Sequence, residues 1–207
     1  MIYKQFKDEK WELPFIYSLP DNISKDKKYP LIVFLHGAGQ RGNDLLHVCD
    51  IGLPKYILCR EDVEAILLVP QCDKNAVWKM LIKDLYVLIN KFIQIFPVDS
   101  KGISLCGISM GAYGSFDFAM TYPDMVKKMV CICGAGDCWR AERLKNIPAR
   151  IFHGDNDPLV PVTNSIEIYE AIKKEGGDVE LTIFHDVGHD SWCRAFESTK
   201  IVDWLVK

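Results

Sequence analysis

The sequence predicts an α/β fold in which a doubly wound, mostly parallel sheet carries helices on both faces. Short apolar runs of strand length recur along the 207-residue chain, and segments with helical periodicity lie between them. Parallel strands joined by helical crossovers are covered on both sides, so apolar residues along the whole strand are expected. A chain of this length suits one hydrophobic core, and we expect a single domain over residues 1–207.

The expected strands are short and bounded by polar or glycine-containing turns. An antiparallel pair is expected first, at residues 2–6 and 15–19, and the later strands at residues 31–35, 65–69, 103–106, 129–133, 149–152 and 179–184. The clearest helix covers residues 80–96 and ends before Pro97; its apolar face is formed by Leu81, Leu85, Leu88, Ile89, Phe92 and Ile95. Further helices are expected at residues 53–59, 112–121, 163–175 and 198–206.

Charge and hydropathy exclude several classes of function. The formal net charge of −3 gives no electrostatic reason to expect nucleic acid, and the basic cluster of Lys25, Lys27 and Lys28 is expected in a solvated loop. No window approaches the apolar length of a membrane span, and residues 1–7 lack the hydrophobic region of a signal peptide. We therefore expect a cytoplasmic protein with no membrane or nucleic-acid partner. The oligomeric state stays open.

The eight cysteines show no pattern of metal ligands or disulfides. Three of them (Cys106, Cys131 and Cys133) lie in or beside strand-like runs, where a free cysteine behaves as a small hydrophobe. The others are scattered without C-x-x-C spacing, which argues against a zinc site and a disulfide framework. We expect reduced structural thiols at Cys49, Cys59, Cys72, Cys138 and Cys193, the last being close to His189 in sequence.

The pentapeptide Gly107-Ile108-Ser109-Met110-Gly111 follows one of these strands and precedes a helical segment. A serine on such a tight strand-to-helix turn projects its hydroxyl out of the sheet, beside the positive end of a helix. Glycines at both ends are expected because a side chain there would meet the neighbouring strand or helix. The pattern alone is a modest signal, since glycine and serine are common in turns.

Candidate partners for the serine follow two later strands. Asp155 and Asp157 lie in the turn-rich loop after residues 149–152, and His189 lies in the loop after residues 179–184. The carboxyl ends of parallel strands share one edge of a sheet, so Ser109, Asp157 and His189 can converge there. A free hydroxyl is a poor nucleophile at neutral pH and needs such a base with an orienting acid.

A further glycine-rich turn, His36-Gly37-Ala38-Gly39, follows the apolar strand expected at residues 31–35. Its backbone can turn an amide N–H toward the serine. The N–H of Met110, the residue after the serine, would be the second donor to a developing oxyanion.

Together these segments resemble an α/β-hydrolase, in particular the small bacterial esterases related to feruloyl and acetyl-xylan esterases and polyhydroxyalkanoate depolymerases. The chain is also similar to the family described as phospholipase/carboxylesterase or predicted peptidase. The resemblance runs from about Leu31 to the C-terminus and rests on the segments at residues 36–44, 70–72, 107–114, 153–161 and 188–192. Ala112 departs from the pattern, because such enzymes commonly have glycine there.

The resemblance implies a serine esterase. Asp157 matches the family's His-Gly-x-x-Asp-x-x-Val-Pro pattern, whereas Asp155 is expected to shape the loop. His189 would then take the Ser109 proton, Asp157 would orient the imidazole, and the Ala38 and Met110 amides would bind the oxyanion of a reaction that passes through an acyl-enzyme. Neither a metal nor an organic cofactor is expected.

The substrate is less well defined by the sequence. Trp78 and Trp192 are candidates to line an acyl pocket, with burial in the core as an equal alternative. Arg41 is a candidate contact for a polar leaving group, and Gly37 and Gln71 lie at the same strand ends. Residues 134–148 are too short to hold a lid domain, which favours an open cleft and soluble short-chain or aromatic acyl esters.

Two other interpretations of the function stay open. The first is an acyl-protein thioesterase or a small-peptide hydrolase of the same fold, and the second is a non-catalytic binding protein that retains this scaffold.

Overall fold

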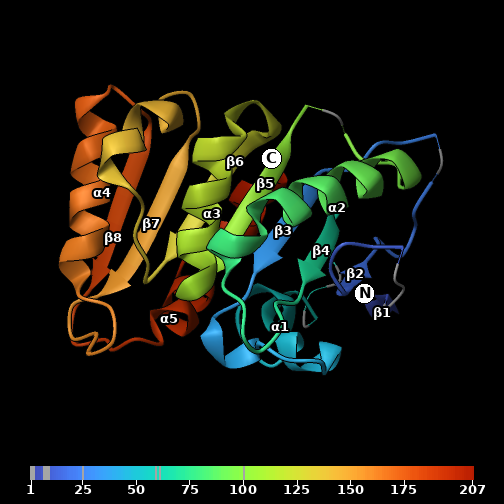
Figure 1. Ribbon diagram of the computed structural model, residues 1–207, viewed down its shortest axis with the longest axis horizontal. Coiled ribbons are helices and arrows are strands. Elements are labelled where there is room, and N and C mark those ends of the chain that lie inside the picture. Colours follow the sequence, from blue (N-terminus) through green and yellow to red (C-terminus); the bar gives the residue numbers. More distant parts are fainter. Residues whose placement is uncertain (1–2, 7–9, 25, 59, 61, 100) are drawn as a thin grey trace.

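A single eight-stranded sheet forms the centre of the structure (Figure 1). The computed structural model describes residues 3–6, 10–24, 26–58, 60, 62–99 and 101–207. The strand order is β1-β2-β4-β3-β5-β6-β7-β8. The strands are β1 (Tyr3–Phe6), β2 (Phe15–Ser18), β3 (Leu31–Leu35), β4 (Ile66–Pro70), β5 (Ile103–Ile108), β6 (Val126–Ile132), β7 (Ala149–Gly154) and β8 (Val179–Phe184).

The sheet is mostly parallel, as the sequence predicts. β1 pairs with β2, and β2 with β4, in antiparallel orientation, and the strands from β4 across to β8 run parallel. The order of the chain reverses at β3, which has β4 on one side and β5 on the other. Loops leave a parallel sheet in opposite directions at such a switch point and open a crevice beyond the carboxyl ends of the strands.

Helices cover both faces of the sheet (Figure 1). The α-helices are α1 (Gly52–Leu58), α2 (Ile82–Ile95), α3 (Met110–Thr121), α4 (Val162–Lys174), α5 (Ser191–Ser198) and α6 (Ile201–Val206). Short 3-10 helices in the described residues lie at Ala38–Gln40, Leu45–Cys49, Trp78–Leu81, Pro123–Met125 and Cys138–Leu144. None of the helices in the described segments is long and apolar enough to cross a membrane.

The sheet separates two apolar cores, which accounts for the apolar sequences of central strands such as β3 (Leu31–Leu35) and β4 (Ile66–Pro70). In β3, Leu31, Val33 and Leu35 belong to the core that also contains side chains of α2, α3 and α4, whereas Ile32 and Phe34 belong to the core that contains side chains of α1, α5 and α6. Alternate side chains therefore enter different cores, and all five are buried.

Several element boundaries differ from those expected. β6 begins at Val126 instead of residue 129. Its half-buried Lys128 is accommodated in the strand because its ammonium group bonds to the Trp204 carbonyl at 2.9 Å and lies over the Trp204 ring, 4.8 Å from the centroid. α5 is not predicted by the sequence, since only Ser191, Ala195 and Phe196 of its eight residues are buried. Three positions in the expected elements lie outside the described residues: Ile2 of the first expected strand, Lys25 of the basic cluster and Cys59 of the helix expected at residues 53–59.

Candidate active site

Ser109 occupies a sharp turn between β5 and α3. Its backbone dihedrals are φ 51° and ψ −121°, a conformation that L-residues rarely adopt, and α3 begins at the next residue, Met110. The Ser109 N–H donates to the carbonyl of Ile132 at 2.8 Å, which ties the turn to the end of β6. The structure therefore holds this serine in a strained position at the carboxyl edge of the sheet.

The glycines on either side of the serine allow this close packing. A Cβ atom on Gly111 would collide with the backbone carbonyl of Leu35, at the end of β3. A Cβ atom on Gly107 would collide with the carbonyl of Gly111. The helix can therefore approach the sheet only because both positions lack a side chain.

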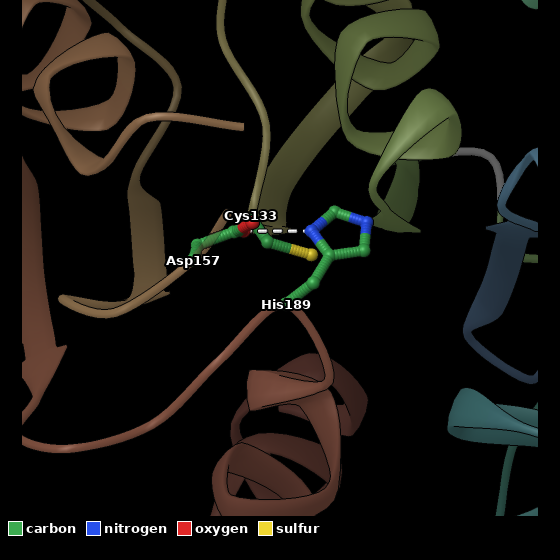
Figure 2. A group of neighbouring side chains, drawn as sticks. All are labelled: Cys133, Asp157 and His189. Atoms are coloured by element: carbon green, nitrogen blue, oxygen red, sulfur yellow. Dashed lines mark hydrogen bonds and ion pairs between the residues drawn. The ribbon is translucent and has the colours of Figure 1, made fainter. Parts of the chain in front are cut away.

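Three side chains from separate strand ends meet at this edge. The Ser109 Oγ atom lies 2.9 Å from His189 Nε2, and His189 Nδ1 lies 2.6 Å from Asp157 Oδ2. Figure 2 shows the contact between Asp157 and His189. Ser109 is half-buried, and the His189 side chain is 17% exposed, so the hydroxyl and the imidazole can be reached from solvent.

The carboxylate of Asp157 is buried and fully hydrogen-bonded. Its Oδ1 atom accepts from the N–H groups of Leu159 at 2.8 Å and Val160 at 2.9 Å, while Oδ2 faces His189 and His153. Burial acts to raise the pKa of Asp157, but the bonds from Val160, His189 and Leu159 outweigh it and leave this pKa below its ordinary value. The acid is therefore ionised at neutral pH and fixed in orientation.

His153 is a second histidine on the same carboxylate. Its Nε2 atom lies 3.1 Å from Asp157 Oδ2 and 2.9 Å from the Val160 carbonyl, and its Nδ1 atom lies 2.7 Å from Ser165 Oγ. The Ser165 hydroxyl donates to the Gly134 carbonyl at 2.9 Å. This contact is not predicted from the sequence, although the spacing of four residues between His153 and Asp157 is a signal that could have indicated it.

The glycine-rich turn after β3 lies against the serine. A Cβ atom on Gly37 would lie 3.7 Å from the Ser109 Cβ atom, and Ala38 is exposed at the start of a 3-10 helix. The first N–H groups of a helix have no partner within it, which leaves the amides of Ala38 and Met110 available as donors. The predicted pair of donors thus comes from two helix starts that flank Ser109.

Buried side chains hold the glycine-rich turn after β3 in place. His36 is neutral, because burial lowers its pKa to about 4; its Nδ1–H donates to the Gly37 carbonyl at 2.7 Å, and its Nε2 accepts from the Cys72 N–H at 3.0 Å. The Trp78 indole N–H donates to the His36 carbonyl at 2.9 Å. Trp78 has no exposed surface, which favours the core interpretation for this residue, although it also borders the cavity beside Met110.

Gln71 and Arg41 also support the turn. The Gln71 amide is buried and donates to the carbonyls of Gln40 at 2.9 Å and Asp44 at 2.7 Å. Arg41 donates through Nε to the Ala38 carbonyl at 2.9 Å. The structure gives both side chains contacts with the loop backbone, so their predicted contact with substrate stays a prediction.

Two cavities are lined by neighbours of these three residues. Trp192 stands edge-on to the His189 ring, with centroids 5.5 Å apart, and lines a cavity of about 220 Å³ together with Ile51, Tyr56 and Phe196. On the other side, Met110 and Tyr113 border a cavity of about 420 Å³, whose charged lining residues are Lys79, Asp117 and Asp137.

The remaining candidate acids and histidines form separate pairs. Asp155 bonds to His185 Nδ1 at 2.7 Å and to the Asp186 N–H at 2.8 Å, so it shapes the loop as expected. His47 lies 2.6 Å from Asp50 through Nδ1 and 3.1 Å from the Gly39 carbonyl through Nε2.

Comparison with known proteins places this geometry in a family. The sequence profile of the phospholipase/carboxylesterase family matches residues 72–202. The chain belongs to this family. It is 30% identical to the protein in the crystal structure of a thermostable esterase, with a TM-score of 0.85, and the match covers 99% of this chain and 62% of that one. The structure and this match confirm the α/β-hydrolase fold.

The curated relatives are more distant by sequence and are longer proteins. Esterase YpfH of Escherichia coli (strain K12) is 25% identical over 92 residues, covering 44% of this chain and 40% of the relative. Prolyl endopeptidase FAP of Bos taurus is 23% identical over 229 residues, covering 90% of this chain and 30% of the relative. The chain thus spans between 30% and 40% of the length of these two relatives.

Proposed function

We propose that this member of the phospholipase/carboxylesterase family is a serine esterase that hydrolyses carboxylic esters through an acyl-enzyme. The observation that carries the proposal is the continuous hydrogen-bonded chain from Ser109 through His189 to Asp157, with distances of 2.9 Å and 2.6 Å. This chain supplies a nucleophile, a base within hydrogen-bonding reach, and an acid that fixes the tautomer of the base.

In the acylation step, Ser109 Oγ attacks the ester carbonyl carbon while His189 Nε2 takes the hydroxyl proton. The N–H groups of Ala38 and Met110 donate to the oxyanion that forms on the carbonyl oxygen. The tetrahedral intermediate then collapses: the bond to the alcohol oxygen breaks, and His189 returns its proton to that oxygen. Asp157 remains ionised and stabilises the imidazolium.

In the deacylation step, a water molecule takes the place of the alcohol. His189 removes a proton from the water as its oxygen attacks the acyl carbon, and the same proton then passes to Ser109 Oγ as the acid leaves. Each step uses the same base and the same two amide donors, so no further group is needed in the proposal.

Soluble short-chain or aromatic acyl esters are the proposed substrates. The cavity of about 220 Å³ that Trp192 borders is lined by three aromatic side chains, Tyr56, Trp192 and Phe196, besides the charged Lys55 and Glu197. This lining favours an apolar or aromatic group. Residues 134–148, between β6 and β7, contain one short 3-10 helix at Cys138–Leu144 and no inserted domain. This supports an open cleft that a soluble ester can enter.

A panel of p-nitrophenyl esters with acetyl, butyryl, octanoyl and aromatic acyl groups tests the proposal. We expect turnover of the short or aromatic esters, and a loss of kcat of at least about 10⁴-fold in Ser109→Ala. Ser198→Ala, which alters an exposed serine on α5, serves as the matched control and keeps wild-type rates. Equal turnover by Ser109→Ala and wild type would rule out this mechanism.

Peptide-bond hydrolysis is the second candidate, favoured by the match to prolyl endopeptidase FAP over 90% of this chain. Adding acyl thioesters and short peptide amides to the panel distinguishes the three classes of substrate. A value of kcat/KM for a peptide amide above that for every ester would favour this second candidate.

A further inference from the structure

A buried thiol lies against the Asp157–His189 pair and has no role in the proposed reaction. Cys133 follows β6 in a left-handed conformation with φ 47°, and it is fully buried. Its Sγ atom, one carboxylate oxygen of Asp157 and one ring nitrogen of His189 all lie within 4.8 Å of one another. Figure 2 shows the thiol beside the imidazole ring.

Ser191 adds an unexplained polar atom at the same place. Its side chain is fully buried, and its Oγ atom makes no hydrogen bond of ordinary geometry with the described residues. The hydroxyl nevertheless lies close enough to Cys133 to act on the thiol. Because a thiol is only a weak acceptor, this buried hydroxyl keeps a desolvation penalty, which a ligand at this point would relieve.

We propose that Cys133, Asp157 and His189 form an inhibitory binding site for a thiophilic divalent cation, with Zn²⁺ as the best match. Sulfur, imidazole nitrogen and carboxylate oxygen are the donor atoms that Zn²⁺ takes in proteins, usually in a tetrahedral arrangement. A water molecule, hydrogen-bonded to Ser191 Oγ, would complete the four ligands. The binding site stands on this donor set alone, whereas its inhibitory effect rests on the proposed function.

Binding of the cation releases one proton, which comes from the Cys133 thiol. Burial raises the pKa of Cys133 to about 12, so the thiol starts protonated and releases its proton to solvent as the metal–sulfur bond forms. In the bound form the imidazole carries its proton on Nε2 instead of Nδ1, and Nδ1 binds the cation in place of its bond to Asp157. Water ligands leave the cation, and Asp157 keeps its bonds from Leu159 and Val160.

The tautomer produced in this way explains inhibition. With a proton on Nε2 and a metal on Nδ1, the imidazole donates to Ser109 Oγ and can no longer accept its proton. Mg²⁺, a hard cation that prefers oxygen ligands and retains water, would bind this site poorly.

The test uses the purified full chain titrated with Zn²⁺ or Mg²⁺ during p-nitrophenyl acetate hydrolysis. We expect saturating Zn²⁺ to lower the rate of wild type by about tenfold or more, with recovery after EDTA, and Mg²⁺ to have no effect. Cys133→Ala should lose the Zn²⁺ response. Cys131→Ala removes another buried thiol, two residues earlier on β6, and should keep it. Cys133→Ser provides a second variant of nearly native volume if alanine impairs folding, because a hydroxyl is a poor ligand for Zn²⁺.

A readout independent of turnover separates this inference from the proposed function. Co²⁺ bound to wild type and to Cys131→Ala should give a thiolate-to-cobalt charge-transfer absorption band that Cys133→Ala lacks. If no ester is hydrolysed but this band appears, the proposed function fails and the metal site stands. If Zn²⁺ inhibits Cys133→Ala as strongly as wild type, or if the Co²⁺ band is absent from wild type or unchanged in Cys133→Ala, the metal site is overturned.

Discussion

The Nε2 atom of His153 lies 3.1 Å from Oδ2 of Asp157, the same oxygen that His189 contacts at 2.6 Å. The side chains of His153 and Asp157 are both completely buried. One carboxylate oxygen thus lies between two imidazoles, and the other is held by two backbone N–H groups. Because Ser165 fixes the far nitrogen of His153, the orientation of Asp157 depends on the packing of α4 against β7.

Replacing His153 should reduce turnover without altering substrate binding. His153→Asn shortens the side chain and removes the ring nitrogen that contacts Asp157, and we expect kcat to fall by about 10- to 100-fold with KM changed little. The matched control is His185→Asn, which breaks an exposed histidine–aspartate pair outside the candidate active site and should leave kcat unchanged. A rise in KM at constant kcat would contradict a positioning role for His153.

Removing the indole N–H of Trp78 should loosen the turn that carries Ala38. Trp78→Phe leaves the buried His36 carbonyl without its donor, and we expect the free energy of unfolding to drop by about 1–3 kcal/mol. We also expect kcat to fall by about tenfold, less than the 10²- to 10³-fold cost of losing a whole oxyanion donor. Urea unfolding and ester kinetics measure the two effects. The fully exposed Trp139, changed to phenylalanine, is the control that should show neither.

The stability provided by the Asp157 carboxylate should depend on pH. Its pKa lies below the ordinary value in the folded chain, so its ionised form is the one that stabilises the fold above about pH 4, and this contribution is lost as the pH falls through the lowered pKa. We expect the difference in unfolding free energy between wild type and Asp157→Asn to be largest near pH 7 and to shrink toward about pH 3. A difference that stays constant over this range would contradict the lowered pKa.

Trp192 should influence the choice of acyl group. Trp192→Ala enlarges the cavity that Trp192 borders and removes one of its aromatic walls. We expect kcat/KM for an aromatic acyl ester to fall by up to about tenfold more than kcat/KM for the acetate ester. Trp139→Ala should leave the ratio of the two values unchanged. The idea of an aromatic binding site here would be wrong if Trp192→Ala lowered both values equally.

The sequence predicted the parts of this site that depend on local pattern and chain order. Ser109 lies in a motif with its own backbone geometry, and Asp157 and His189 each follow a recognisable apolar strand. Once the sheet is parallel, their meeting at one edge follows from topology. For the same reason the turn at Ala38 could be placed beside the serine before its contacts were known.

The supporting contacts could not be predicted, because they depend on packing between distant elements. His153 and Ser165 meet only because α4 lies on β7, and Gln71 reaches the Gln40 carbonyl from the end of another strand. The position of the Cys133 thiol could not be predicted from its sequence pattern. Its apolar surroundings in sequence indicate a small core residue, yet its left-handed backbone at the end of β6 places the thiol against His189.

The most direct test of the proposed esterase is active-site titration with a fluorophosphonate, which reacts with serine hydroxyls that a neighbouring base activates. We predict that the folded chain takes up one equivalent, that peptide mapping finds it on Ser109, and that Ser109→Ala and urea-unfolded wild type take up none. Labelling of folded Ser109→Ala at the wild-type level, or no labelling of folded wild type, would contradict the account.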